Sequence, residues 1–178
     1  MDTVLELENV SVHFDTPDGT VQAVRDVSLS LKSGETLAIV GESGCGKSLT
    51  ARAILGILPR GATAAGSVRF EDRELIGLPE KTMSRLRGRS MAMIFQEPMT
   101  ALNPVLTVGE QAAEPLRLHL GLSKAEARKR VIELFAEVGI PSPGERYTVY
   151  PHELSGGMRQ RVMIAMALTC RPSLLLAD

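Results

Sequence analysis

The stretch that decides the fold is Gly41-Glu42-Ser43-Gly44-Cys45-Gly46-Lys47-Ser48, which lies between an apolar run and a helical pattern. It fits G-x-x-x-x-G-K-[ST], the pattern of a phosphate-binding loop. The glycines allow the backbone to curl so that successive N–H groups face one anion at the positive end of the following helix. Lys47 would bring a positive charge to the β- and γ-phosphates, and the Ser48 hydroxyl would bind Mg²⁺. The alternative, an ordinary glycine-rich turn, is disfavoured because both the motif and its context are complete.

The residues before this loop have the patterns of strands. Alternation over 5–14, with a phase slip at Glu8-Asn9, and again over 21–31 predicts an antiparallel sheet with a bulge. The continuous apolar run Thr36–Val40 is typical of a strand buried on both faces. The chain therefore approaches the loop through β-structure.

Helices and strands alternate after the loop. A helical stripe covers 47–58 and ends at Pro59. Further strands are expected at 67–70, at 91–95 and, as a last buried strand, at 174–177, with a helix at 156–169. Two more helices are expected to open with capping boxes, Thr107 with Glu110 and Ser123 with Glu126, and the second buries Ala127, Val131, Leu134, Phe135 and Val138. The pattern predicts an α/β domain with an antiparallel sheet in front and a helical insertion.

Composition excludes several classes of protein. The 178 residues are 44% hydrophobic and 23% charged, which indicates a globular chain rather than a disordered one. A formal net charge of −1 and only 4 Phe, 2 Tyr and 0 Trp argue against a nucleic-acid partner. The first residues lack a basic region typical of a signal peptide, and the most apolar stretch, 162–170, is too short to span a bilayer. We expect a protein that is soluble by itself.

Two further segments are candidates for nucleotide contacts. Leu174-Leu175-Leu176-Ala177-Asp178 is an apolar strand that ends in a carboxylate, which can orient Mg²⁺ or its water. Ser155-Gly156-Gly157 precedes a helix and offers a hydroxyl and bare N–H groups to an anion. For this second segment, a glycine-broken loop with a capped helix is an equal alternative on physical grounds.

The order of these segments resembles that of an ABC transporter ATP-binding subunit. Leu154-Ser155-Gly156-Gly157-Met158 is similar to the signature motif of that family, which is more selective than a phosphate loop. The two stretches that resemble the dipeptide, oligopeptide and nickel importers are Phe95-Gln96-Glu97-Pro98-Met99-Thr100-Ala101-Leu102-Asn103-Pro104 and Tyr150-Pro151-His152-Glu153-Leu154-Ser155-Gly156-Gly157-Met158-Arg159-Gln160-Arg161. The resemblance covers essentially the whole chain.

This resemblance implies a role for particular residues. Residues Gly41–Ser48 would bind ATP, and Phe14 would stack on its adenine, with a strand-core role for Phe14 an equal alternative. Gln96 would contact the Mg²⁺ and γ-phosphate region, unless it is an ordinary exposed loop glutamine. Mg²⁺ would be bound by Ser48, Gln96 and Asp178. Residues Leu154–Met158 would contact the ATP held by a partner subunit.

The resemblance also implies an architecture and partners. The fold would be a P-loop NTPase with a RecA-like core: residues 1–178 form an incomplete nucleotide-binding domain, within which about 97–157 form a helical subdomain. Two such ATPase subunits would meet head-to-tail and dock on membrane-spanning permease subunits. An extracytoplasmic solute-binding protein would be an indirect partner. The subunit would lie peripherally on the cytoplasmic face of the inner membrane.

The chain departs from the family pattern at its end. It stops at Asp178, where the family continues with a glutamate that acts as general base and, later, with a switch histidine. We therefore expect a chain cut short of an intact subunit, which binds ATP but hydrolyses it poorly or not at all. Two alternatives stand beside the importer: a non-hydrolysing nucleotide-binding or interaction fragment, and a soluble ABC-type ATPase acting on nucleic acid or ribosomes. The near-neutral charge counts against the last.

Overall fold

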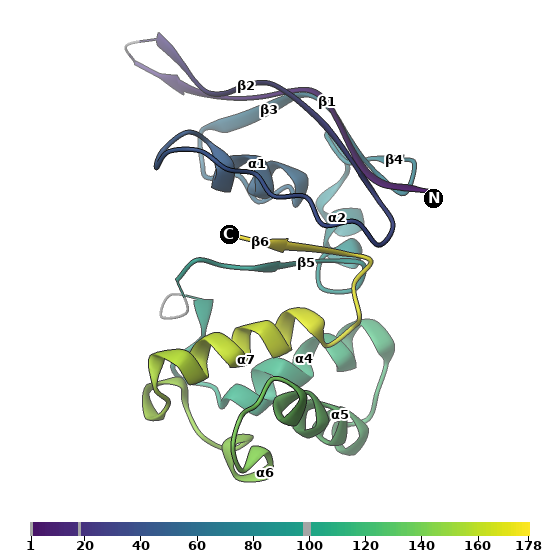
Figure 1. Ribbon diagram of the computed structural model, residues 1–178, viewed down its shortest axis with the longest axis vertical. Helices are drawn as coiled ribbons and strands as arrows, with labels where there is room; N and C mark the ends of the chain where they lie inside the picture. The colour runs from purple at the N-terminus through teal and green to yellow at the C-terminus, as the bar shows by residue number, and fades with distance from the viewer. Residues whose placement is uncertain (1, 18, 98–100) are drawn as a thin grey trace. The chain divides into compact units, whose positions relative to one another are not determined.

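The computed structural model describes residues 2–17, 19–97 and 101–178, and it divides into two compact units, Met1–Ser84 and Arg85–Asp178 (Figure 1). Pro98, Met99 and Thr100, which belong to one of the importer-like stretches, lie outside the described residues. No described helix has both the length and the apolar character needed to cross a membrane.

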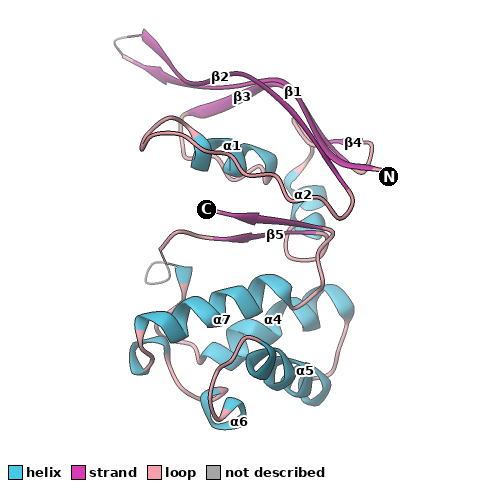
Figure 2. Cartoon of the chain, in the orientation of Figure 1, coloured by secondary structure: helices cyan, strands magenta, loops and turns pink. Residues whose placement is uncertain are grey.

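The first unit is built on an antiparallel sheet (Figure 2). Its strands are ordered β2-β1-β3-β4 and comprise β1 (Thr3–Thr16), β2 (Gly19–Lys32), β3 (Ala62–Phe70) and β4 (Arg73–Glu74). The register of β1 shifts between Leu7 and Val10 against β2, and Asn9 has a φ of 50°. The phase slip predicted at Glu8-Asn9 is confirmed as a bulge, because one extra residue reverses the faces of the strand.

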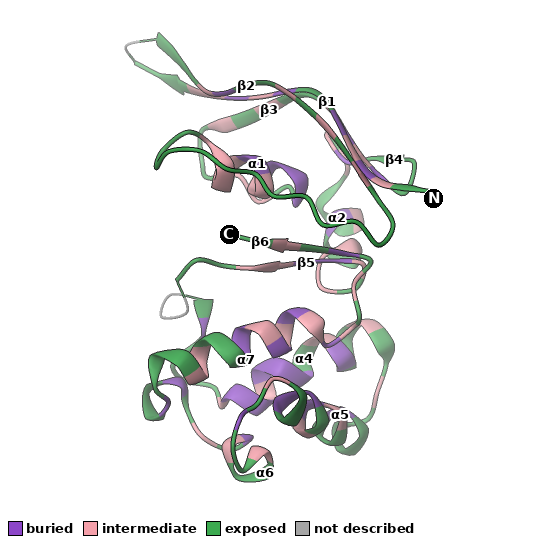
Figure 3. Cartoon of the chain, in the orientation of Figure 1, coloured by how far each residue is buried: buried purple, intermediate pink, exposed green. Residues whose placement is uncertain are grey.

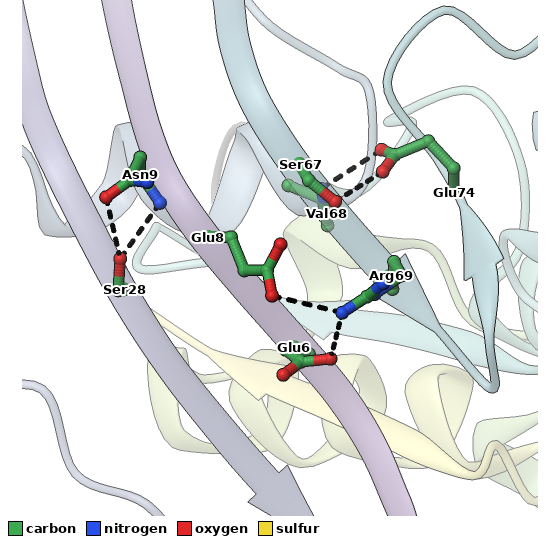
Figure 4. A network of polar contacts seen from close by, with 8 residues as sticks. All are labelled: Glu6, Glu8, Asn9, Ser28, Ser67, Val68, Arg69 and Glu74. Carbon is green, nitrogen blue, oxygen red and sulfur yellow. Dashed lines mark hydrogen bonds and ion pairs between the residues drawn. The ribbon is translucent and has the colours of Figure 1, made fainter.

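One face of this sheet forms the core of the first unit. Alternate side chains of β1 and β3 are buried: Leu5, Leu7, Val10, Val12, Val68 and Phe70 (Figure 3). The exposed positions carry ion pairs instead, and Arg69 bonds Glu6 at 2.7 Å and Glu8 at 3.1 Å (Figure 4). The hydrogen bond and charge of Glu6 raise the pKa of Arg69. These pairs are half-exposed, so burial rather than charge stabilises the sheet.

The prediction of a buried strand at Thr36–Val40 is wrong in this structure. The segment is assigned to no strand, and Leu37, Ile39 and Val40 are 44%, 49% and 88% exposed. An apolar run indicates that burial of the segment is favourable. A strand buried on both faces also needs neighbouring strands to pair with and a layer of structure on each face. Among the described residues of the first unit, no strand pairs with it.

Helix α1 (Lys47–Ile54) follows the phosphate-binding loop and is shorter than predicted. It ends before Pro59 because Gly56 adopts a left-handed φ of 62°. The N–H of Gly56 donates to Ala53 O at 3.1 Å and the N–H of Ile57 donates to Arg52 O at 3.0 Å. This pair of bonds is a Schellman motif, in which glycine closes the last turn at no steric cost.

The second unit combines a two-stranded parallel sheet with a helical cluster. Helix α2 (Glu80–Leu86) spans the boundary of the units; the elements that follow are β5 (Met91–Ile94), α4 (Val108–Leu120), α5 (Lys124–Glu137), α6 (Pro143–Arg146), η1 (Pro151–Glu153), α7 (Gly156–Leu168) and β6 (Leu174–Ala177). The expectation that 174–177 is a buried strand holds only in part, since Leu174 is 2% exposed but Leu175 is 41% exposed. Among the described residues β6 pairs only with β5, and its side chains alternate between buried Leu174 and exposed Leu175.

The helical cluster has its own core. Ala127, Val131, Leu134 and Phe135 of α5 are buried, as the stripe predicts, whereas Val138 is half-buried at the C-cap. They pack with residues of α4 and α7, notably Val108, Leu116 and Val162. Burial of each of these Val, Leu and Phe side chains contributes on the order of 1.5–3 kcal/mol.

One of the two expected capping boxes forms. Ser123 Oγ accepts from the N–H of Glu126, and the Glu126 carboxylate accepts from the N–H of Ser123. Thr107 caps α4 as expected, but the Glu110 carboxylate pairs with Arg117 and Lys124 at 3.3 and 3.5 Å. The second box is therefore incomplete, because two cations outcompete one backbone N–H for the carboxylate.

Candidate nucleotide-binding site

The phosphate-binding loop is exposed over Gly41–Cys45 and half-buried over Gly46–Ser48, and it depends on glycine at its entry to α1. Gly46 is the N-cap with φ 98° and ψ 2°, and an added Cβ there would lie 2.9 Å from both Ala23 O and Val24 Cγ2. Gly44 also has a positive φ of 81°, but nothing lies within 4 Å of its Cβ position. A side chain at Gly46 would therefore collide with strand β2, whereas at Gly44 it would meet only backbone strain.

Lys47 turns back over its own loop. Its Nζ donates to Gly41 O at 2.8 Å and to Glu42 O at 2.7 Å, and it lies 3.6 Å from Cys45 Sγ. An ammonium has three donors, so these contacts hold the positive charge on the loop and leave it close to the N-terminus of α1. The Lys47 ammonium thus lies over the loop, where the motif predicts an anion.

The residues of the loop fit the phosphates of a nucleotide. The N-cap residue of α1 makes no side-chain capping hydrogen bond, and the first turn holds no acidic residue. The first N–H groups of a helix lack intrahelical acceptors, so an uncapped N-terminus can donate them to an anion. The Ser48 hydroxyl, in the first turn, belongs to the oxygen ligands that Mg²⁺ prefers.

Gln96 and Asp178 lie at one edge of the parallel β5–β6 pair. Ile94 pairs with Ala177, and the N–H of Asp178 donates to Ile94 O at 3.0 Å. Gln96 follows β5 by two residues, and both side chains are exposed. The carboxyl ends of parallel strands meet at the same edge, and this places an amide and a carboxylate together.

The proposed Mg²⁺ ligands come from both units. Ser48 belongs to the first unit, while Gln96 and Asp178 belong to the second. Within residues 2–17, 19–97 and 101–178 there is no group of three or more His, Cys, Asp or Glu that could hold a metal ion. The proposed set of Mg²⁺ ligands, the hydroxyl of Ser48, the amide of Gln96 and the carboxylate of Asp178, stays a prediction.

The signature-like segment forms the exposed N-terminus of α7. Leu154 is 3% exposed and anchors the segment in the helical core, whereas Ser155, Gly156 and Gly157 are exposed. Ser155 is the N-cap, and its Oγ accepts from the N–H of Met158 at 3.3 Å. Nothing lies within 4 Å of the Cβ positions of the two glycines, so the backbone there is open to a close approach.

Phe14 lies near the end of β1, opposite Val21 of β2 and Ala62 of β3. Its side chain is half-buried, between a core position and a free surface. Stacking of this ring on adenine therefore stays a prediction.

Two contacts near these segments are not visible in the sequence patterns. The buried amide of Gln111 accepts from Asn103 N at 2.8 Å and donates to Asn103 O and Leu106 O, both at 2.9 Å. Arg159 Nε donates to Leu154 O at 3.0 Å. The only sequence signal for the Gln111 contacts is a polar residue on a buried helix face. The only signal for the Arg159 contact is that helical side chains lean toward the N-terminus of their helix.

The α/β architecture and the glycine-lysine loop before α1 define a P-loop nucleotide-binding fold. A family model described as ABC transporter matches residues 24–178, and the chain belongs to this family. The resemblance stated from the sequence is thereby confirmed.

Similar proteins include peptide transport subunits. The chain is 54% identical over 180 residues to the dipeptide transport ATP-binding protein DppD of Bacillus subtilis (strain 168), covering 100% of this chain and 54% of DppD. It is 53% identical over 175 residues to the oligopeptide transport ATP-binding protein OppD of Salmonella typhimurium, covering 98% of this chain and 52% of OppD. The chain spans about half the length of the curated relatives it matches.

The fold is similar to a solved structure of an ATP-binding cassette. MJ0796, in a dimeric post-hydrolysis state bound to ADP and Pi, superposes with a TM-score of 0.87 at 29% identity, covering 98% of this chain and 73% of that chain. The predicted fold class is confirmed by this similarity.

Proposed function

We propose that this chain is the ATP-binding part of an ABC importer subunit, which couples ATP binding and hydrolysis to uptake of peptides or a related solute, with nickel a further candidate. The observation that carries the proposal is the loop itself: an uncapped helix N-terminus beneath a lysine whose Nζ bonds the loop carbonyls of Gly41 and Glu42. The names of the relatives DppD and OppD support peptide transport.

Each residue of the loop has a role in this proposal. The backbone N–H groups of Gly44, Gly46 and Lys47 bind the phosphates, and the Lys47 ammonium offsets the charge of the β- and γ-phosphates. Ser48, Gln96 and Asp178 would supply the oxygen ligands of Mg²⁺, which when bound would neutralise charge on the phosphates. Gln96 orients the attacking water, and Phe14 stacks on the adenine.

Partners follow from the exposed signature segment. Ser155, Gly156 and Gly157 bind the γ-phosphate of ATP held by a second ATPase subunit, in a head-to-tail dimer. Dimeric structures of MJ0796 support such an assembly. Permease subunits dock on the helical subdomain, about 97–157, on the cytoplasmic face of the membrane, and a solute-binding protein delivers the solute to them.

A polypeptide of residues 1–178 is proposed to bind ATP and to hydrolyse it poorly. The roles assigned above include phosphate binding, Mg²⁺ binding and water orientation, but none of these residues is assigned as a general base. Phosphoryl transfer to water relies on a group that positions or activates the water as well as on charge stabilisation. The alternative function is accordingly a nucleotide-binding fragment that does not turn over.

Titration with a fluorescent ATP analogue and Mg²⁺ tests the binding proposal. Lys47→Ala removes the ammonium and is expected to weaken binding at least about tenfold, which corresponds to ~1.4 kcal/mol. Lys129→Ala is the matched control, because Lys129 is an exposed lysine of α5 in the second unit. A folded wild-type protein that binds no nucleotide, or equal affinities for Lys47→Ala and wild type, would contradict the proposal.

A phosphate-release assay separates the two functions. Little or no turnover by the 178-residue polypeptide is expected, together with intact binding. Turnover that disappears in Lys47→Ala would contradict the expectation of poor hydrolysis.

A further inference from the structure

The signature segment is held from the side of helix α7 by an arginine side chain. Arg159 lies in the second turn of α7 (Gly156–Leu168), and its side chain runs back toward the helix N-terminus, where Nε donates to Leu154 O at 3.0 Å. Side chains on helices lean toward the N-terminal turn, so position 159 can reach the residue before the N-cap. The bond joins the helix to the loop that enters it.

This bond orients the peptide plane between Leu154 and Ser155, which directly precedes the exposed N–H groups. In a trans peptide the carbonyl and the next N–H point in opposite directions, so a fixed Leu154 carbonyl fixes the direction of the Ser155 N–H. The Leu154 side chain is buried, and its N–H donates to Pro151 O at 3.2 Å, which anchors the preceding turn. The side chain of Leu154 is therefore held by the core, and its carbonyl is held by Arg159.

The backbone N–H groups that this bond orients, those of Ser155, Gly156 and Gly157, make no hydrogen bonds among the described residues that hold the fold together. Ser155 makes its hydrogen bonds within the described residues through Oγ and the carbonyl, and its N–H makes none. The N–H groups of Gly156 and Gly157, at the first two helical positions, have no intrahelical acceptor. Three consecutive donors thus depend on the geometry of a segment in which two of the three residues, Gly156 and Gly157, have no side chain to hold them.

We propose that Arg159 is a positioning residue for the signature segment: by bonding Leu154 O it preorganises the N–H groups of Ser155–Gly157 for the γ-phosphate of a partner's ATP. This inference rests on the proposed role of that segment in nucleotide-dependent association. Preorganised donors bind an anion better than donors that must first be ordered, since the ordering cost is removed.

Helix α7 supplies a matched control. Arg161 is a second arginine two residues further on, and it too donates to a backbone carbonyl, that of Val138 at the end of α5. Arg159→Met and Arg161→Met each remove a positive charge, the guanidinium donors and a bond to a backbone carbonyl from the same helix, and Met keeps a high helix propensity. Only the first touches the signature segment.

Two measurements on the 178-residue protein test the proposal. Amide exchange of Met158, whose N–H is protected by Ser155 Oγ, is expected to accelerate about tenfold in Arg159→Met and to be unchanged in Arg161→Met. Association of two copies with MgATP, measured by sedimentation velocity, is expected to weaken at least about tenfold in Arg159→Met alone. Arg159→Lys, which keeps a donor, is expected to recover part of both.

The outcomes separate the inference from the proposed function. Arg159→Met with wild-type exchange and wild-type association overturns the inference, as does an equal effect of Arg161→Met. An association defect that disappears in high salt also overturns it, because salt screens a charge effect but not a positioning effect. If the wild type does not associate with MgATP, the proposed role of the signature segment fails, and the Met158 exchange rates still decide whether Arg159 holds that segment.

Discussion

Replacement of Gly46 by alanine is the sharpest test of the loop geometry. A non-glycine residue in the left-handed region costs roughly 1–2 kcal/mol. The new Cβ would also lie 2.9 Å from Ala23 O, a backbone atom of β2, and 2.9 Å from Val24 Cγ2. Val24 is 4% exposed, so neither neighbour can move without disturbing the sheet, and such overpacking costs about 1–3 kcal/mol more.

Gly44→Ala isolates the backbone component. Gly44 has a φ of 81°, yet nothing lies within 4 Å of its Cβ position. Gly44→Ala should therefore lose only the roughly 1–2 kcal/mol of backbone strain, and Gly46→Ala should be less stable than Gly44→Ala by a further 1–3 kcal/mol or so.

Urea unfolding followed by circular dichroism measures this difference directly. A lower midpoint with an unchanged slope reports a loss of stability. Because Gly46 is the N-cap of α1, Gly46→Ala should also weaken binding of a fluorescent ATP analogue. Equal midpoints for the two variants would refute the claim that β2 blocks a side chain at Gly46.

Three further predictions follow from the described contacts. Hydrogen bonds from the side chain and backbone of Ser123 lower the pKa of Glu126, so Glu126→Gln should be less stable than wild type above pH 4.5, the ordinary pKa of the residue. The gap should close as the pH falls through the lowered pKa; urea midpoints across pH check this, and a constant gap would exclude a charge effect. Gly157→Ala should raise the free energy of unfolding by about 0.5 kcal/mol, since nothing lies within 4 Å of the added Cβ. The same substitution should weaken MgATP-dependent association, because the Cβ hinders close approach of a phosphate to the backbone. Unchanged association would contradict the claim that an anion approaches the backbone at Gly157. Alkylation of Cys45, exposed and 3.6 Å from Lys47 Nζ, should obstruct nucleotide binding, and full affinity after complete modification would contradict the loop assignment.

Several elements could be predicted because their determinants are local. The bulge in β1 follows from a phase slip at Glu8-Asn9, and the start of α5 follows from Ser123 and Glu126, three residues apart. The phosphate-binding loop was recognisable for the same reason, since its glycines and lysine act on backbone within eight residues. Interactions within one turn are determined almost entirely by residue type and spacing.

Other features depended on partners far along the chain. The apolar pattern of Thr36–Val40 predicts a strand, but pairing requires a neighbour, and no described strand of the first unit provides one. Similarly, the spacing of Thr107 and Glu110 predicts a capping box, but Lys124 and Arg117 take the carboxylate. The spacing of two residues shows that their side chain and backbone could form a hydrogen bond. It does not show which other groups of the folded chain bind the same side chain instead.

By itself, the sequence determined that this protein has a phosphate-binding loop between a β-rich region and a helix, and that its motifs are those of the ABC transporter family. The tertiary structure alone decided that Gly46 lies against strand β2, that Gln96 and Asp178 share one edge of the β5–β6 pair, and that Arg161 reaches the carbonyl of Val138, 23 residues earlier in the chain. The physical reason is range: a motif encodes hydrogen bonds within a few residues, whereas burial, strand pairing and side-chain reach are set by the path of the folded chain.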